Sequence, residues 1–266
     1  MTLAKALTIA GSDSGGGAGI QADLKTFAAL DVYGTSAITA ITAQNTCGVS
    51  AVQGLDPEIV AAQIRAVVSD IGVGAAKTGM LFSSEIINVV AATVQALHVQ
   101  PLVVDPVMVA TSGDRLLRQE AEESMRRHII PLAAIVTPNL AETEVLLGHP
   151  VASLEEMRAA AAELVAHGAR AVVIKGGHAV VKATDVFYDG THMELLQTEV
   201  VETQNTHGTG CTFSAAICAY LAHGASLLEA VRRAKTYITG ALRQSLSIGQ
   251  GSGPVGHFWR ITYPVD

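Results

Sequence analysis

The segment Asn205–Cys211, with the sequence Asn-Thr-His-Gly-Thr-Gly-Cys, holds residue types suited to phosphate chemistry. Gly208 and Gly210 allow the backbone to turn tightly and to direct its N–H groups outward. Apolar residues at helical spacing follow in residues 212–222, so the Cys211 thiol is expected in the first turn of a helix, where the helix dipole adds positive potential. We therefore predict a phosphoryl-binding site with a thiol beside it.

Thr206 or Thr209 is expected to cap this helix, because a threonine hydroxyl accepts a hydrogen bond from an N–H group of the first turn. The segment also allows a plainer interpretation. On that interpretation the two glycines only turn the chain, and Cys211 is a small buried residue. Residues elsewhere in the chain decide between the two interpretations.

Composition limits the class of partner. The chain has 266 residues, a net charge of −7 and a pI near 5.7, so it offers no basic field for nucleic acid or for an anionic membrane. No run of about 18 apolar residues indicates a membrane span, and we expect a cytoplasmic protein. The length is typical of one α/β domain, placed at residues 1–266. The three cysteines form no Cys-x-x-Cys pair and the histidines show no zinc-ligand spacing, so we expect reduced thiols and no structural metal.

Short apolar segments alternate with amphipathic segments, a pattern typical of parallel strands connected by helices. We predict strands at residues 6–10, 35–41, 75–80, 101–108, 133–136 and 171–174. Helices are expected from Pro57 and at residues 86–97, 120–130, 154–167 and 227–242. Asp189-Gly190 indicates a hairpin within residues 184–199, which adds antiparallel strands at one edge. The predicted fold class is α/β, with a largely parallel sheet covered on both faces.

A glycine or a polar residue comes after the apolar run of each of four predicted strands: Gly11, Asp105, Asn139 and Lys175. In an open α/β sheet, ligands bind beyond the carboxyl ends of the strands, so these residues are expected on one rim. A lysine that closes an apolar strand is costly to bury but suits a phosphate group. Asp105 and Glu142 are suited to Mg²⁺, directly or through its water molecules. Asn139 can also simply cap the helix that carries Glu142.

Two other segments are candidates for ligand contact. Residues 11–19 form a glycine-rich loop between the first strand and its helix, where a flexible linker would be unusual. The spacing of these glycines differs from the dinucleotide-binding pattern. The Gln44 amide can donate and accept together, which suits the edge of a nitrogen heterocycle, although a glutamine after a strand is also common as a loop residue.

Six motifs occur in order along the chain: Gly11-Ser-Asp-Ser-Gly-Gly-Gly-Ala-Gly-Ile-Gln-Ala-Asp-Leu-Lys-Thr26, Ala43-Gln-Asn-Thr-Cys-Gly-Val49, Val104-Asp-Pro-Val-Met108, Thr137-Pro-Asn-Leu-Ala-Glu142, Lys175-Gly-Gly-His178 and Asn205-Thr-His-Gly-Thr-Gly-Cys211. Together they resemble the hydroxymethylpyrimidine/phosphomethylpyrimidine kinases of thiamine biosynthesis, which belong to the ribokinase-like superfamily. The resemblance covers residues 6–241. Several of the motifs are long and specific.

The resemblance implies a ribokinase-like three-layer α/β/α sandwich with a largely parallel central sheet and a few antiparallel edge strands. It implies an ATP- and Mg²⁺-dependent kinase that acts on a small pyrimidine. Such kinases phosphorylate 4-amino-5-hydroxymethyl-2-methylpyrimidine and then phosphorylate the monophosphate to the diphosphate. The resemblance also suggests a homodimer.

Roles for individual residues follow from the same resemblance. Gln44 would bind the edge of the pyrimidine, and the ring would be surrounded by Gly11, Ala18, Met80 and Val107. The ATP phosphates would face Asn139, Lys175 and Thr209, and the metal region would face Asp105 and Glu142. Gly208 and Gly210 would form an anion hole, and Lys175 and Cys211 would be the other catalytic residues.

Cys211 departs from the wider superfamily, which usually carries aspartate at the end of this motif. Cysteine there is typical of the pyrimidine kinase branch and also occurs in some pyridoxal kinases. We predict that Cys211 takes the proton of the substrate hydroxyl, because a helix N-terminus lowers the pKa of a thiol and favours the thiolate. Incoming phosphates oppose this effect, so positioning of the hydroxyl is the alternative role.

Two other functions are alternatives to the pyrimidine kinase. The first is a pyridoxal or pyridoxine kinase of the same branch. The second is a catalytically silent vitamin-binding protein on the same fold, against which the intact Asp105, Glu142, Lys175 and Cys211 argue.

Overall fold

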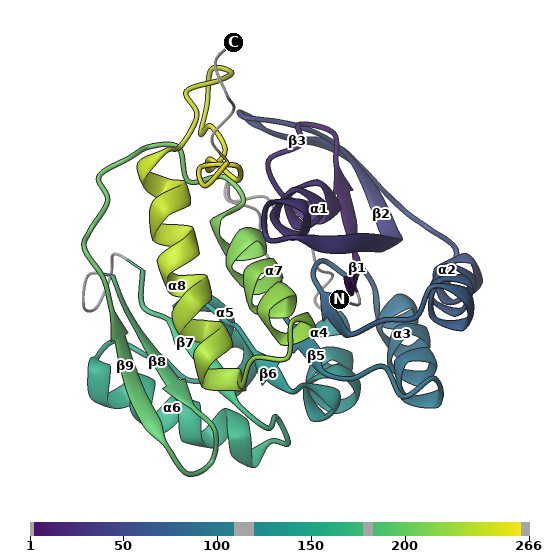
Figure 1. Ribbon diagram of the computed structural model, residues 1–266. Coiled ribbons are helices and arrows are strands. Elements are labelled where there is room, and N and C mark those ends of the chain that lie inside the picture. Colours follow the sequence, from purple (N-terminus) through teal and green to yellow (C-terminus); the bar gives the residue numbers. More distant parts are fainter. Residues whose placement is uncertain (1–2, 109–119, 178–182, 262–266) are drawn as a thin grey trace.

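A nine-stranded sheet forms the centre of the computed structural model, which describes residues 3–108, 120–177 and 183–261 (Figure 1). His178, the last residue of one motif, lies outside these ranges. In space the strands run in the order β3-β2-β1-β4-β5-β6-β7-β8-β9. Their bounds are β1 Ala4–Asp13, β2 Val32–Asn45, β3 Gly48–Gly54, β4 Ala75–Thr78, β5 Leu102–Val104, β6 Ile135–Val136, β7 Val172–Lys175, β8 Thr184–Tyr188 and β9 Met193–Gln197.

The six neighbouring strands β2, β1, β4, β5, β6 and β7 pair in parallel, whereas β3, β8 and β9 pair antiparallel at the two edges. Tyr188 pairs with Met193 across the predicted Asp189-Gly190 hairpin turn. The prediction of an α/β fold with antiparallel edge strands is therefore confirmed. Its parallel connections pass through helices that cover the sheet, as expected for parallel strands.

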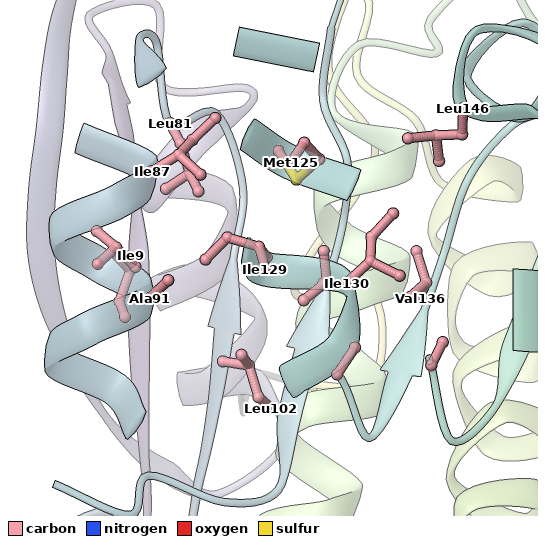
Figure 2. Packing of buried hydrophobic residues seen from close by; sticks show 14 of the residues in the cluster. Ile9, Leu81, Ile87, Ala91, Leu102, Met125, Ile129, Ile130, Val136 and Leu146 are labelled. Carbon is pink, nitrogen blue, oxygen red and sulfur yellow. The ribbon is translucent and has the colours of Figure 1, made fainter. Parts of the chain in front are cut away.

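Helices cover both faces of the sheet. Residues of α2 (Pro57–Asp70), α3 (Ser84–Ala96) and α6 (Leu154–Ala166) belong to one buried apolar cluster, and those of α1 (Gly19–Ala29), α7 (Thr209–Ala222) and α8 (Leu227–Arg243) belong to the other. Neighbouring residues of a strand point to opposite faces, so Ala76 lies in the first cluster and Ala75 in the second. We call the two sides the α3 face and the α7 face. Figure 2 shows Ile9, Ile87 and Leu102 on the α3 face.

Several predicted boundaries were wrong. β1 continues to Asp13 and β2 to Asn45, so Gly11 and Gln44 lie inside strands instead of in loops. The cause at β2 is its antiparallel partner β3, which was not predicted and which supplies backbone hydrogen bonds to residues of low strand propensity. β4 and β5 end earlier than predicted, at Thr78 and Val104. Near residues 120–130 the chain forms the short helix α4 (Ala121–Ser124), a π-helix (Met125–Ile129) and a 3₁₀-helix (Ile130–Leu132) in place of one regular helix.

Candidate active site

A cavity of about 350 Å³ opens at the carboxyl ends of the parallel strands. It is lined by all the residues that were predicted to belong to the site: Gly11, Ala18, Gln44, Met80, Asp105, Val107, Asn139, Glu142, Lys175, Gly208, Thr209, Gly210 and Cys211. These residues come from at least seven separate segments of the chain. They meet because the carboxyl ends of parallel strands lie at the same edge of an open α/β sheet, where ligands bind.

The glycine-rich turn before α7 forms one wall of this cavity. Gly208 is the N-cap residue and has φ +80°, a left-handed conformation that favours glycine. A side chain at Gly208 would also collide with the carbonyl oxygen of Gly17. Cys211 lies in the first turn of the helix, as predicted. The predicted cap was wrong: the Thr209 hydroxyl instead donates to the Thr206 carbonyl at 2.6 Å, and α7 has no side-chain cap among the described residues.

Lys175 and two carboxylates form the charged centre of the cavity. The Lys175 ammonium lies 3.2 Å from Asp105 Oδ1 and 4.0 Å from Glu142 Oε2. Asp105 is also bound by hydroxyls, since Thr137 Oγ1 donates to Oδ1 at 2.9 Å and Ser214 Oγ donates to Oδ2 at 3.1 Å. Most of the acceptor capacity of Asp105 is therefore already used by protein groups.

The two carboxylates differ in their ionisation. Burial opposes the charged form of Asp105, but the ammonium groups of Lys175 and Lys77 hold the pKa of Asp105 below its usual value. Burial raises the pKa of Glu142 to about 7, and Lys175 only partly offsets this effect. Glu142 is thus the group that a divalent cation could most readily bring into its charged form.

Asn139 and Glu142 form a reciprocal capping box at the start of α5 (Leu140–Leu147). The Asn139 side chain accepts from the Glu142 N–H at 2.8 Å, and Glu142 Oε2 accepts from the Asn139 N–H at 2.8 Å. The capping role that the sequence suggested is therefore confirmed. Both side chains nevertheless line the cavity, so capping and ligand contact are compatible.

The other wall carries the predicted ring-binding residues. Gln44 projects from β2, and its Oε1 accepts a hydrogen bond from Thr42 Oγ1 at 3.0 Å. Met80 is 6 % exposed, and a side chain at Gly11 would collide with its terminal methyl group. Glycine at position 11 therefore leaves room for Met80 to form an apolar wall beside the Gln44 amide.

Sequence reasoning missed the pair Asp13 and His207. Asp13 accepts hydrogen bonds from the N–H groups of Gly15, Gly17 and Ala18 at 2.8–3.0 Å, and His207 Nε2 lies 2.9 Å from Asp13 Oδ2. Burial opposes ionisation of Asp13, but its bonds to His207 and the backbone lower its pKa. The pair ties the glycine-rich loop to the turn before α7. An aspartate two residues before a run of three glycines was the available signal, because aspartate often binds the N–H groups of its own turn.

The thiol of Cys211 does not have the expected ionisation. Burial raises the pKa of Cys211 to about 11, although Lys77 and a hydrogen bond with the Gly19 N–H favour the thiolate. The prediction that the helix N-terminus lowers this pKa was therefore wrong for the ligand-free protein. Desolvation outweighs the helix dipole, because an anion at this partly buried position loses much of its hydration while the dipole contributes only a fraction of a charge.

A second cavity of about 330 Å³ adjoins the first, sharing Lys175, Thr206 and Thr209 with it. Its apolar wall includes Phe213, Ile238 and Leu242, and its polar wall includes Asp185, Lys235 and Thr239. The sequence did not reveal it, because its walls come from β8, the segment at 198–201 and two helices. Its position places an apolar chamber next to the candidate phosphate site.

The described residues lack two features. They hold no group of three or more His, Cys, Asp or Glu side chains arranged to bind a metal ion. Within the same residues, no helix combines the length and apolarity needed to cross a membrane.

The sheet order, the glycine turn at a helix N-terminus and the lysine with two carboxylates define a small-molecule kinase of the ribokinase-like class. Comparison with known proteins refines this class. The family model described as phosphomethylpyrimidine kinase matches residues 13–256. The chain therefore belongs to the phosphomethylpyrimidine kinase family.

Individual relatives agree with this assignment. A hydroxymethylpyrimidine/phosphomethylpyrimidine kinase of Rhizobium meliloti (strain 1021) is 54% identical, over 96% of this chain and 97% of the relative. The crystal structure of a phosphomethylpyrimidine kinase from Clostridium difficile 630 has a TM-score of 0.81 and 44% identity, covering 90% of this chain and 99% of that one. The pyridoxal kinase from Staphylococcus aureus in complex with AMP-PCP and pyridoxal has a TM-score of 0.88 and 41% identity, covering 97% and 94%.

Proposed function

We propose that this protein phosphorylates 4-amino-5-hydroxymethyl-2-methylpyrimidine with ATP and then phosphorylates the monophosphate to the diphosphate, in thiamine biosynthesis. The observation that carries the proposal is the single cavity that joins a heterocycle-sized apolar wall to the Gly208–Cys211 turn and Lys175. The family and the relative at 54% identity support the same activity. A homodimer and a cytoplasmic location stay predictions.

The ring is assigned to the wall that carries Gln44. An amide beside Met80 and Val107 offers a donor and an acceptor within an apolar surround, which suits an aminopyrimidine edge. Gly11 and Ala18 present only backbone and one methyl group there, so a flat ring can approach closely. The hydroxymethyl substituent would then point toward Cys211, which lines the same cavity.

The nucleotide is assigned to the junction of the two cavities. Its phosphates would meet Asn139, Lys175 and Thr209, and its nucleoside would occupy the adjoining apolar chamber. A relative crystallised with AMP-PCP supports an ATP-type phosphate donor. This arrangement leaves the terminal phosphate next to the glycine turn, which is where the ring hydroxyl is also placed.

The carboxylates fit Mg²⁺, which takes few protein ligands and keeps several waters. When bound with the nucleotide, Mg²⁺ would supply neutralisation of phosphate charge. Glu142 would hold it, since the described partners of this carboxylate are two backbone N–H groups, of Asn139 and Met108, and a more distant lysine. Asp105 would face the metal region through water, because Thr137, Ser214 and Lys175 already occupy its oxygens.

The chemistry follows from charge and position. Gly208, Gly210 and Lys175 line the cavity. The N–H groups of the two glycines and the Lys175 ammonium would face the negative charge that grows during phosphoryl transfer and would stabilise the transition state. Cys211 is assigned the substrate hydroxyl. Because burial raises its pKa to about 11, the thiol of the ligand-free protein is protonated near neutral pH, and orientation of the hydroxyl becomes the larger part of its assigned role.

Pyridoxal phosphorylation is the second candidate, favoured by the solved pyridoxal kinases with TM-scores near 0.9. One experiment separates the two. The purified protein is incubated with MgATP and either the pyrimidine alcohol or pyridoxal, and the products are identified by mass spectrometry. We expect pyrimidine diphosphate to accumulate through the monophosphate. Exclusive phosphorylation of pyridoxal would overturn the proposal, and a Lys175→Ala sample controls for contaminating kinases.

A further inference from the structure

A fully buried ion pair lies beside the cavity without lining it. The Lys77 ammonium on β4 lies 2.8 Å from Asp23 Oδ1 on α1, and both side chains are 0 % exposed. Thr8 on the neighbouring strand donates to the other carboxylate oxygen at 2.6 Å. A buried ion pair is often no more stabilising than apolar residues of the same size, so stability alone gives little reason for one here.

The Lys77 ammonium lies directly behind the wall of the cavity to which the ring is assigned. A Cβ atom built on Gly79 would be 3.7 Å from Lys77 Nζ, and Gly79 lines the cavity. Lys77 belongs to the α7 face of the sheet, because its neighbour in register is Val103, a residue of the apolar cluster on that face. Its charge is therefore held between the sheet and α7, near the cavity and out of reach of solvent.

One side of α7 faces this charge. Cys211, Ser214 and Cys218 are spaced so that they lie on the same side of the helix. Ser214 bonds to Asp105 just beyond β5, the strand next to β4, and Cys218 is fully buried. This side of the helix thus lies over the ends of β4 and β5. The thiol of Cys211 is the member of the row that also lines the cavity.

We propose that Lys77, held in place by Asp23, is a positioning residue for the reaction: its ammonium group sits behind the Cys211 sulfur and favours negative charge there. The inference rests on the proposed function for its catalytic meaning. Lys77 touches neither ring nor nucleotide, since it is fully buried. It acts through the thiol.

The charges around Cys211 come from four elements. Lys77 on β4 and Lys175 on β7 favour the thiolate, whereas Asp23 on α1 and Asp105 after β5 oppose it. Burial opposes the thiolate most strongly and raises the pKa of Cys211 to about 11. Lys77 favours the Cys211 thiolate more than Asp23 opposes it, so the ion pair as a whole favours negative charge on the sulfur. Without Lys77, no cation on the β4 side among the residues that the structure describes would offset the burial.

Asp23 explains how a flexible lysine can keep this place. A lysine side chain has many rotamers, and one ion pair inside a packed layer fixes its ammonium group. The Thr8 hydroxyl in turn fixes the carboxylate. Replacing Lys77 by methionine removes the charge and keeps a long apolar chain, whereas replacing Asp23 by asparagine removes the opposing charge and keeps a hydrogen-bonding group.

The test measures the reactivity of Cys211 independently of turnover. Cys47 is exposed and Cys218 is buried, so a Cys47→Ser background leaves Cys211 as the thiol to be followed with iodoacetamide and peptide mass mapping. At about pH 8, where the rate is proportional to the thiolate fraction, we expect Lys77→Met to slow alkylation about tenfold or more. Asp23→Asn should alkylate at least as fast as the parent. Lys5→Met, at the amino-terminal end of the neighbouring strand β1, is the matched control and should not change the rate.

The double variant Asp23→Asn/Lys77→Met separates positioning from folding. Lys77→Met should lower the midpoint of thermal unfolding, because Asp23 is then buried without its partner. Removing both charges should restore the midpoint, since no unpaired charge stays buried. We expect its Cys211 alkylation to stay slow and its turnover to stay about tenfold or more below the parent, with the KM of the ring substrate kept. Recovery of the parental alkylation rate together with the thermal midpoint would overturn the proposal. Absence of kinase activity in the parent would overturn the proposed function and leave the alkylation result interpretable.

Discussion

The two faces of the sheet differ in what they bury. The α3 face holds a continuous apolar cluster that runs from α2 through α3 to α6. The α7 face is also apolar at its centre, yet it buries Asp23 and Lys77, the only charged side chains with no exposed surface among the described residues. The strand β4 contributes side chains to both faces, because Ala76 points to the α3 face and Lys77 points to the α7 face.

This difference indicates that the α3 face contributes mainly to stability and the α7 face mainly to the reaction. The α3 face gains stability from burial of apolar surface, and no residue of its cluster lines the cavity. The α7 face carries Cys211 and the glycine turn, so polar groups there are paired near the site of chemistry. Substitutions on the α7 face should therefore change turnover more than stability, and those on the α3 face should do the reverse.

The largest effect is expected for Cys211→Ala. Loss of the group that meets the substrate hydroxyl should lower turnover by about 10²- to 10⁴-fold, while the affinity for nucleotide stays close to that of the parent. Steady-state assays and calorimetry with a non-hydrolysable ATP analogue measure the two quantities. Cys211→Asp should retain more activity than Cys211→Ala, because related kinases use a carboxylate at this place. Near-parental turnover of the alanine variant would reduce Cys211 to a packing residue.

The matching substitution on the α3 face is Ile87→Ala. Ile87 is fully buried and packs in the apolar cluster shown in Figure 2. Its truncation leaves a cavity and should lower the free energy of unfolding by about 2–5 kcal/mol. Urea denaturation measures this loss, and turnover at a temperature where the variant is folded should be unchanged. A large fall in turnover of the folded variant would contradict the division between the faces.

The sequence was enough to predict the rim of the site. Gly11, Asp105, Asn139 and Lys175 each end an apolar segment, and parallel strands bring such ends together without any knowledge of the loops. The capping box at Asn139 is a local pattern within four residues, so it was also predictable. What could be predicted depended on local spacing or on a general rule of the fold class.

Properties that depend on distant pairing could not be predicted in this way. Asp23 and Lys77 are 54 residues apart, and neither shows a local pattern that links it to the other. β3 forms because β2 offers it an edge, and its own residues have no strong alternation. The raised pKa of Cys211 results from burial by several elements, which the helix N-terminus alone did not reveal.

Lys175→Ala should act on the α7 face through charge. Removing the ammonium takes away stabilisation of the transferring phosphoryl group and leaves Asp105 and Glu142 without a shared cation, so turnover should fall on the order of 10²-fold. Affinity for the pyrimidine should change much less. Rapid-quench kinetics and ring binding by calorimetry distinguish the two, with Lys5→Ala as a control. Unchanged turnover with weaker ring binding would remove Lys175 from the phosphate site.

Gln44→Ala should have a smaller effect of the opposite kind. It removes a donor and an acceptor from the assigned edge of the heterocycle and leaves Lys175 and the glycine turn intact. Loss of this paired edge should cost about 1–3 kcal/mol of ring affinity. Calorimetric titration with the pyrimidine alcohol measures it. Equal affinities of variant and parent would place the ring elsewhere in the cavity.

The smallest effect concerns the proton held by Glu142, whose pKa burial raises to about 7 from an unfolded value of 4.5. Between these two pKa values the folded protein keeps a proton that the unfolded chain releases, so the free energy of unfolding should fall as the pH rises through this window. Glu142→Gln imitates the protonated form and keeps a capping-box side chain. Relative to this variant, the parent should lose about 1 kcal/mol between about pH 6 and 7.

The same proton should govern binding of Mg²⁺ if Glu142 holds the metal, because the cation needs the ionised carboxylate. Metal-induced stabilisation in the presence of an ATP analogue should therefore grow as the pH rises through about 7 in the parent, and it should be weak and nearly independent of pH in Glu142→Gln. Urea unfolding at several pH values, with and without Mg²⁺, measures both effects. Parallel stability curves for parent and variant would show that Glu142 ionises normally in the folded protein, and metal stabilisation of equal size in both would assign Mg²⁺ to other groups.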